Sequence, residues 1–159
     1  LEASFGTGYL LTRLAERFDT TGIDINSEMP AVARKNLEKA GVRAEIFRAS
    51  VEELPFRDKS FDSIVSTMAF SGYPDGRLAL QELRRVLKDD GRLIIVDPGY
   101  PSDGNSLGTI STRLWKAGGD IIRDVPVFLD QTGFEAETRE IGGFGSIHLH
   151  LAEKRSSGR

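Results

Sequence analysis

The sequence predicts a doubly wound α/β fold whose mostly parallel sheet of seven strands ends in a C-terminal antiparallel hairpin. Short apolar segments alternate along the 159 residues between strand-like and helix-like periodicity. A glycine-rich turn, Gly6-Thr7-Gly8, follows the first strand-like segment, and Leu93-Ile94-Ile95-Val96 is the continuous apolar run of a buried parallel strand. This alternation is typical of doubly wound sheets, and the right-handed crossover rule fixes most of their connections.

The first third of the chain is expected to hold three strands, at residues 1–3, 21–25 and 43–48. A helix over residues 9–18 separates the first two strands. Its apolar stripe consists of Leu10, Leu11, Leu14, Ala15 and Phe18.

The second helix has recognisable start and stop signals. We expect Ser27 to cap it, and Pro30 is tolerated in its first turn. The helix then runs to about Ala40, where Gly41 supplies a left-handed C-terminal cap.

The middle of the chain predicts a fourth strand at residues 61–66, after a turn at Asp58-Lys59. A helix over residues 76–87 buries one leucine-rich side, and Asp89-Asp90-Gly91 is expected to end it. The fifth strand then covers residues 92–97.

The last third contains a long connection, a helix and the closing hairpin. Residues 100–119 are expected to form a binding loop or lid, because long connections in compact domains often do. A helix follows at 120–131, and residues 134–141 and 146–153 form the hairpin.

Composition is that of a soluble globular domain, with 39% hydrophobic and 28% charged residues. The formal charge of −3 gives no general attraction to nucleic acid or to anionic membranes. The chain has no cysteine, which excludes disulfides and thiol catalysis and fits a cytoplasmic location. No apolar run approaches the roughly 18 residues of a membrane span. The oligomeric state stays open.

One domain is expected over residues 1–154, with residues 155–159 a disordered tail or vector remnant. The chain begins at Leu1, inside an expected strand, so we expect further residues to precede it in the natural protein.

The turn between the first strand and helix indicates a nucleoside site. Gly6 and Gly8 permit positive φ and let a ligand approach the backbone. A dinucleotide-binding turn has a third glycine where this chain has Leu11, which favours a ligand without pyrophosphate. Glu2 suits a cationic ligand, and Asp24 can accept both hydroxyls of a ribose. A simple tight turn, with Asp24 as a capping residue, is the alternative.

These motifs resemble class I S-adenosylmethionine-dependent methyltransferases, which have a Rossmann-like fold. The first two motifs are Glu2-x-x-x-Gly6-x-Gly8 and residues 22–26, Gly-Ile-Asp-Ile-Asn. Residues 50–56, 60–66 and 82–93 also resemble segments of the type 11 branch, which methylates quinones and small molecules. The resemblance covers roughly residues 1–97.

The resemblance implies S-adenosylmethionine as cofactor. Its binding residues would be Glu2, Ala3, Gly6, Thr7, Gly8, Asp24, Ile25, Ser50, Val51 and Ser66. Two positions depart from the family. Ser50 stands where an aspartate commonly binds the adenine amino group, and Ser71-Gly72 stands where many relatives carry two histidines.

No residue is identified as a catalytic base. The candidates for contact with a methyl acceptor are Tyr9, Tyr73, Asp97, Tyr100 and Trp115. Asp97 ends the fifth strand, where open α/β sheets place ligands, although each candidate also has a packing or turn interpretation. His148 and His150 share one strand face, but no carboxylate pattern completes a metal site, so a structural role is favoured.

The sequence therefore predicts a methyltransferase with a small-molecule or lipid-like acceptor. A degenerate, non-catalytic S-adenosylmethionine-binding domain is the first alternative. A nicotinamide-dependent oxidoreductase is less favoured, because of Leu11 and Glu2. By resemblance, a segment before the first strand closes over the acceptor, so a longer natural form is expected to turn over faster.

Overall fold

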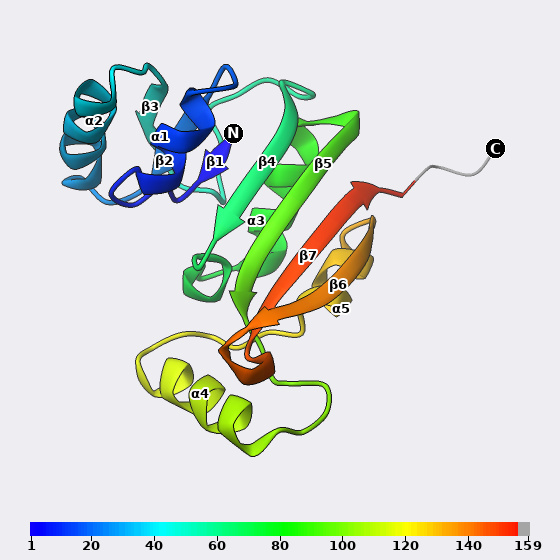
Figure 1. Cartoon of the computed structure of the whole chain (residues 1–159). Coiled ribbons are helices and arrows are strands. Elements are labelled where there is room, and N and C mark those ends of the chain that lie inside the picture. The colour runs from blue at the N-terminus through cyan, green and yellow to red at the C-terminus, as the bar shows by residue number, and fades with distance from the viewer. Residues whose placement is uncertain (156–159) are drawn as a thin grey trace.

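The computed structural model describes residues 1–155 and confirms the doubly wound, Rossmann-like α/β fold. A sheet of seven strands has the order β3-β2-β1-β4-β5-β7-β6 (Figure 1). Strands β1 to β5 are parallel, whereas β7 lies antiparallel between β5 and β6. The strands are β1 (Glu2–Ala3), β2 (Thr21–Asp24), β3 (Glu45–Arg48), β4 (Phe61–Thr67), β5 (Leu87–Pro98), β6 (Phe134–Gly142) and β7 (Ile147–Lys154).

Helices lie on both faces of this sheet. Those of the described residues are α1 (Tyr9–Ala15), α2 (Met29–Ala40), α3 (Gly76–Val86), α4 (Ser106–Ala117) and α5 (Val125–Gln131), with 3-10 turns η1 (Phe70–Gly72) and η2 (Gly143–Gly145). A small core joins α1 and α2 to one face of β2 and β3. The main core joins α3 and α5 to the opposite face. The carboxyl ends of β1, β2, β4 and β5 therefore meet at one edge, which is the edge that holds the site.

The segment expected to be a long loop contains a helix instead. Helix α4 forms because the Asn105 side chain accepts hydrogen bonds from the N–H groups of Leu107 and Gly108. Such a cap satisfies N–H groups that the first turn leaves free.

The prediction of a helix over residues 120–131 is also wrong for residues 120–124, which are not helical. Helix α5 begins at Val125, because Asp124 caps it by accepting from the Val127 N–H. Pro126 lies in its first turn, where a proline is tolerated.

Residues 89–91 do not end helix α3, contrary to the expectation. The helix stops at Val86 and β5 begins at Leu87. Phe61 pairs with Leu87 and Ser63 pairs with Arg92, so the extra residues of β5 form a bulge.

The caps of the first two helices are partly as expected. Gly41 ends α2 with φ 69°, which confirms the left-handed cap. Ser27 is not the N-cap, which is Glu28, and the Glu28 N–H donates to the Asn26 side chain. Helix α1 ends at Ala15, which leaves Phe18 65% exposed rather than buried.

The C-terminal hairpin is confirmed, with η2 joining β6 to β7. Arg155, expected in the tail, is held by an ion pair with Asp130, and its N–H donates to the Gly133 carbonyl. Residues 156–159 lie outside the described part of the chain.

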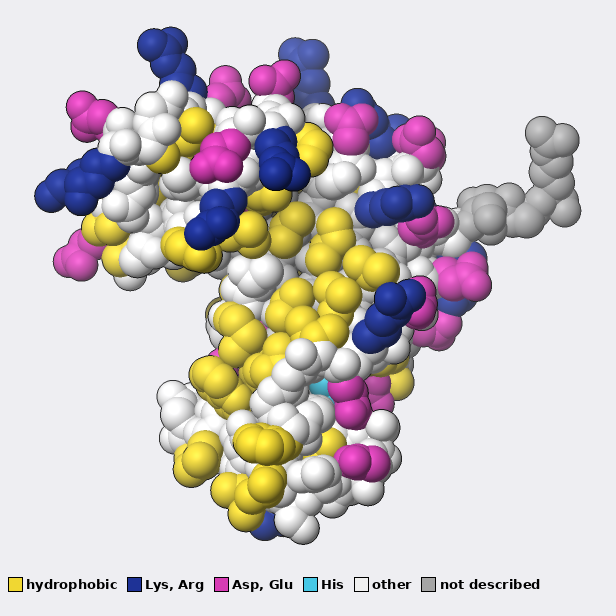
Figure 2. Space-filling view, viewed as in Figure 1, with side chains coloured by type: hydrophobic (Ala, Val, Ile, Leu, Met, Phe, Trp, Pro, Cys, Tyr) yellow, Lys and Arg dark blue, Asp and Glu magenta, His cyan; other side chains and the backbone are white. Residues whose placement is uncertain are grey.

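Apolar side chains remain on the sheet surface that α1 and α2 do not reach (Figure 2). They are half-buried on β4, β5 and β7, as at Val65, Ile94 and Leu149. Within residues 1–155, no helix combines the length and the apolar character needed to cross a membrane.

Gly22 is predicted to be essential for packing α1 on the sheet. A Cβ at Gly22 would lie 2.7 Å from Phe5 Cδ1 and 2.8 Å from Leu11 Cδ1, both buried. We expect Gly22→Ala to lower the free energy of unfolding by about 1–3 kcal/mol, measured by urea denaturation. Gly72→Ala is the matched control, because no heavy atom lies within 4 Å of its added Cβ. Equal losses in both variants would contradict the packing argument.

Candidate functional site

The turn after β1 is built from residues in the left-handed conformation. Ser4, Gly6 and Gly8 have φ angles of 63°, 53° and 78°. Gly8 is the N-cap residue of α1 and provides no side-chain cap, so the first N–H groups of the helix remain available at this edge.

The two glycines of the turn have different roles. A Cβ added to Gly6 would meet no heavy atom within 4 Å, so the space above it is open. A Cβ on Gly8 would lie 2.7 Å from the Cβ of Ala33 on α2. Gly6 thus leaves room for a ligand, whereas Gly8 lets α2 pack against the turn.

Asp24 connects the end of β2 to this turn. Its Oδ2 accepts a hydrogen bond from the Gly6 N–H at 2.8 Å, and its Oδ1 accepts from the Asn26 N–H at 2.9 Å. The residue as a whole is only 7% exposed. Each carboxylate oxygen has a further lone pair, so Asp24 can hold the turn and still accept a ligand hydroxyl.

Glu2 is a buried carboxylate with unused hydrogen-bonding capacity. The residue is 2% exposed, and Oε2 has no hydrogen-bond partner among the described residues. Burial raises the pKa of Glu2 to about 7, because the ionised form loses water. An adjacent cation would restore the favourable environment that this carboxylate lacks.

Tyr73, one of the acceptor candidates, is buried and contacts the turn after β1. Its hydroxyl is 3.0 Å from Ser66 Oγ and 3.3 Å from Ser4 Oγ. The ring packs edge-on against buried Phe70, with centroids 5.7 Å apart. The structure thus connects Tyr73 to Ser66 of the expected cofactor set, through a contact that no local sequence signal reveals.

Three further residues of the expected cofactor set follow β2 and β3. Ile25 comes directly after Asp24 and is 67% exposed, so an apolar surface is available beside this carboxylate. Val51 is buried in the main core. Ser50 Oγ accepts from the Glu52 N–H at 3.2 Å, which fixes the turn after β3.

Asp97 is buried at the end of β5 and lies near Ser71, one of the two positions that depart from the family pattern. Ser71 Oγ lies 2.9 Å from Asp120 Oδ1 and 3.4 Å from Asp97 Oδ1. Burial raises the pKa of Asp97 to about 7. Nothing in the local sequence pairs Ser71 or Asp120 with Asp97, because η1 and the loop before α5 bring them together.

The remaining acceptor candidates are dispersed. Tyr9 is 68% exposed on α1 and stacks with the Arg13 guanidinium, 4.7 Å from the ring centroid. Trp115 lies on α4, and Tyr100 is 47% exposed beyond the end of β5. Of these three residues, Tyr100 lines a cavity beside β5, which is described next.

That cavity has a volume of about 450 Å³ and lies between β5, β7 and the start of α5. His148 and His150 line it from one face of β7, as their alternation predicts. His150 Nδ1 is 2.8 Å from Thr138 Oγ1, and burial lowers the pKa of His150 to about 4. The ring is therefore neutral at physiological pH.

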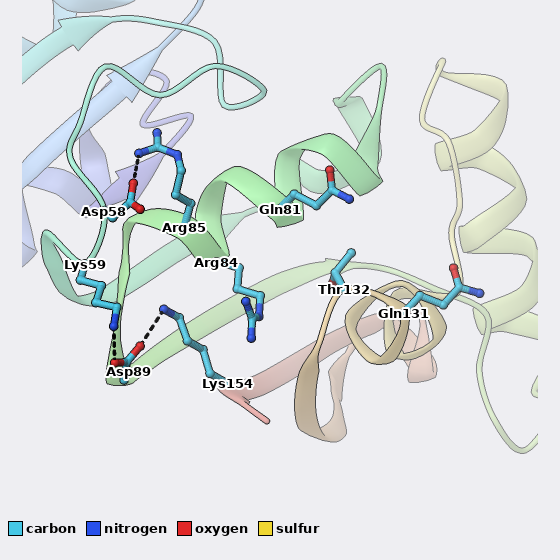
Figure 3. A pocket seen from close by; sticks show the side chains of 9 residues that line it. All are labelled: Asp58, Lys59, Gln81, Arg84, Arg85, Asp89, Gln131, Thr132 and Lys154. Carbon is cyan, nitrogen blue, oxygen red and sulfur yellow. Dashed lines mark hydrogen bonds and ion pairs between the residues drawn. The ribbon is translucent and has the colours of Figure 1, made fainter. Parts of the chain in front are cut away.

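Another cavity, of about 560 Å³, lies at the opposite edge of the sheet (Figure 3). Its charged side chains pair with one another, as Lys59 does with Asp89 at 2.6 Å and Arg85 with Asp58 at 2.9 Å. These exposed ion pairs link the residues before β4 to the start of β5 and to the end of α3, at the strand ends opposite the turn after β1.

Glu2 gives a testable dependence of stability on pH. Its folded pKa of about 7 exceeds the ordinary value of 4.5, so the native state binds more protons than the unfolded chain between these values. Wild-type stability therefore falls as pH rises through this window. We expect Glu2→Gln to raise the free energy of unfolding above pH 7, by roughly 1–3 kcal/mol, and to lose this advantage near pH 4.5.

Urea denaturation across this pH range measures the effect. Glu16→Gln is the control, because Glu16 is exposed on the surface. A Glu2→Gln advantage that did not change with pH would show that titration of the carboxylate is not its cause.

Comparison with known proteins matches this chain to one family. A family model described as "Methyltransferase domain" matches residues 1–95. A demethylmenaquinone methyltransferase of Thermotoga maritima is 37% identical over 113 residues, covering 69% of this chain and 48% of that protein. A phosphatidylethanolamine N-methyltransferase of Cereibacter sphaeroides is 34% identical over 116 residues, covering 72% of this chain and 57% of that protein. The chain thus spans about half the length of these relatives.

Solved structures show the same fold. The crystal structure of an S-adenosylmethionine-dependent methyltransferase from Aquifex aeolicus superposes with a TM-score of 0.73 at 21% identity, covering 95% of this chain and 79% of that one. The family model, the sheet order and the turn after β1 agree. The chain therefore belongs to the methyltransferase domain family and has the fold of the S-adenosylmethionine-dependent methyltransferase that it superposes on.

Proposed function

We propose that this chain transfers a methyl group from S-adenosylmethionine to a small-molecule or lipid-like acceptor. The observation that carries the proposal is the buried, unpartnered Glu2 carboxylate beside the open space over Gly6. A cationic amino acid moiety would satisfy Glu2, whereas the phosphates of a dinucleotide would be repelled by it. This contrast supports S-adenosylmethionine over a nicotinamide cofactor.

The described residues fit the cofactor along its length. Glu2 would bind its ammonium group, and the backbone from Ala3 through Gly6, Thr7 and Gly8 would bind its amino acid end. Asp24 would bind the ribose hydroxyls.

The adenine end would lie beyond the ribose. Exposed Ile25 offers an apolar contact there, and Ser50 and Val51 follow the adjacent strand. Ser66, hydrogen-bonded to Tyr73, would bound the site below the turn.

When bound, the cofactor supplies an electrophilic methyl group on a sulfonium. The chain itself supplies alignment and exclusion of water. For a hydroxyl or carbon acid acceptor, a base is also required, and Asp97 is the best placed of the acceptor candidates. Burial raises its pKa, so the carboxylate is near half-ionised at neutral pH, and the nearby Asp120 carboxylate, which accepts from Ser71 at 2.9 Å, raises the pKa further.

The acceptor class is inferred from the relatives and from the apolar character of the site edge. One relative is named for a quinone and another for a phospholipid, both lipid-like molecules. Tyr100 and the apolar residues of α4 lie beyond β5, where such an acceptor would approach.

We expect S-adenosylhomocysteine and S-adenosylmethionine to raise the melting temperature of the chain, since a ligand that binds only the native state stabilises it by mass action. NAD and NADP at the same concentrations should leave it unchanged. Differential scanning fluorimetry measures the four shifts. Stabilisation by NAD without any by S-adenosylhomocysteine would overturn the cofactor assignment.

Turnover tests the enzymatic half of the proposal. The chain is incubated with methyl-labelled S-adenosylmethionine and a panel containing a demethylated quinol, phosphatidylethanolamine and water-soluble amines. Labelled product from a lipid-like member is expected, with a rate that rises through about pH 7 for a quinol as Asp97 ionises. Cofactor binding without product from any acceptor would favour the non-catalytic alternative.

Asp24→Ala is expected to weaken S-adenosylhomocysteine binding about 10- to 100-fold, from the loss of charged hydrogen bonds worth roughly 1.5–3 kcal/mol. Asp24→Asn should lose less, because one acceptor oxygen remains for the Gly6 N–H. Isothermal titration calorimetry gives both affinities, and circular dichroism checks the fold. A folded alanine variant with wild-type affinity would refute the ribose role.

A further inference from the structure

Helix α4 exposes its apolar side to solvent and packs its small, polar side against the protein. Leu107, Ile110 and Leu114 are 57%, 53% and 68% exposed, whereas Gly108 and Thr112 are buried. Spacings of three and four residues place the three apolar side chains on one helix face. A surface helix of a globular protein normally has the reverse arrangement.

Close contacts fix this orientation. A Cβ on Gly108 would lie 2.1 Å from the carbonyl oxygen of Phe144, so a side chain there would prevent this approach of α4 to η2. Thr112 Oγ1 donates a hydrogen bond to the Gly99 carbonyl at 2.6 Å. The helix cannot roll to bury its apolar face without losing both contacts.

The charges around α4 favour an anionic partner. Its two charged residues, Arg113 and Lys116, are basic and exposed, and neither belongs to an ion pair found within residues 1–155. Of the neighbouring acids, Asp103 accepts a hydrogen bond from its own turn and Asp120 accepts one from Ser71. These hydrogen bonds leave both carboxylates negative, but α4 itself carries two positive charges and no acidic residue, on a chain whose net charge is −3.

We propose that α4 docks this domain on the surface of an anionic lipid bilayer. Leu107, Ile110 and Leu114 enter the boundary between headgroups and acyl chains, as the apolar face of an interfacial helix does. Arg113 and Lys116 reach the lipid phosphates with their long side chains. Acidic residues elsewhere on the chain oppose this little, because charges separated by more than about 8 Å are screened at physiological salt.

The position of α4 suits this contact. It lies at the end of the molecule away from α1 and α2 (Figure 1), and hydrophobic side chains gather on the surface of that end (Figure 2). A second copy of the chain is a poorer occupant of this face. Three aliphatic side chains, each smaller than aromatic rings that bury roughly 150–250 Å², do not supply the about 800 Å² per partner of a stable interface.

The chain contains its own reporter for the proposal. Trp115 is the single tryptophan, and it lies on α4 with 38% of its surface exposed. Its fluorescence is followed while vesicles of phosphatidylcholine, with or without phosphatidylglycerol, are added to the full chain. Blue-shifted emission and co-sedimentation with the phosphatidylglycerol vesicles are expected, both weakened by high salt.

Two sets of substitutions separate the apolar and the charged contributions. Leu107→Ser, Ile110→Ser and Leu114→Ser together should lower the partition coefficient at least about 100-fold. Arg113→Gln with Lys116→Gln should lower it about 30-fold, or roughly fivefold per cation.

The matched control places serine at exposed apolar sites on other helices, with Leu78→Ser on α3 and Val127→Ser on α5. It should bind vesicles as the wild type does. Melting curves and circular dichroism show whether each variant is folded.

Three results would overturn the proposal. One is wild-type chain that does not sediment with anionic vesicles, and another is an equal loss of binding in the control variant. The third is a wild-type dimer, seen by light scattering, that the triple serine variant converts to a monomer, because a second copy would then occupy the face. Failure of the methyltransferase proposal would leave these readouts unchanged, since none of them depends on turnover.

Discussion

The candidate site depends on the carboxylate of Asp24. By accepting hydrogen bonds from the Gly6 and Asn26 N–H groups, it joins the end of β2 to the turn after β1. That turn runs through left-handed conformations that are unfavourable for an isolated chain, and for Ser4 most of all. With the turn fixed, Gly8 can meet α2 and the space above Gly6 stays open. One hydrogen bond between residues 18 positions apart thus supports both the packing of α2 on the turn and the open space above Gly6.

The parts of the site that the sequence predicts are those set by short-range chemistry. Gly6, Gly8 and Gly41 adopt the positive φ angles that their positions indicate, because only the local backbone is involved. Asp24 lies at the end of its strand for the same reason. The mostly parallel sheet with its C-terminal antiparallel hairpin follows from the alternation of elements along the chain.

The parts that escape prediction depend on contacts between distant segments. The link from Tyr73 to Ser4 spans 69 residues, and that from Ser71 to Asp120 spans 49. The prediction missed helix α4 for another reason. Residues 100–119 contain several glycines, as a loop does, but Gly108 lies within the helix and permits its close contact with η2. Its apolar spacing, had it been read as a helix, would have suggested that the exposed face was buried.

Both buried carboxylates of the ligand edge are costly in the same way, yet they lie on opposite faces of the sheet. In the strand register Glu2 lies opposite Val65, on the face of the sheet that α1 and α2 cover. Asp97 lies opposite His148, on the face that carries the main core. Burial raises the pKa of each to about 7. A ligand cation bound at the turn would relieve this cost at Glu2, whose Oε2 has no partner among the described residues. Under the proposed function, Glu2 would therefore hold the cofactor's ammonium group, whereas Asp97, near neutrality in its ionisation, would take a proton from the acceptor.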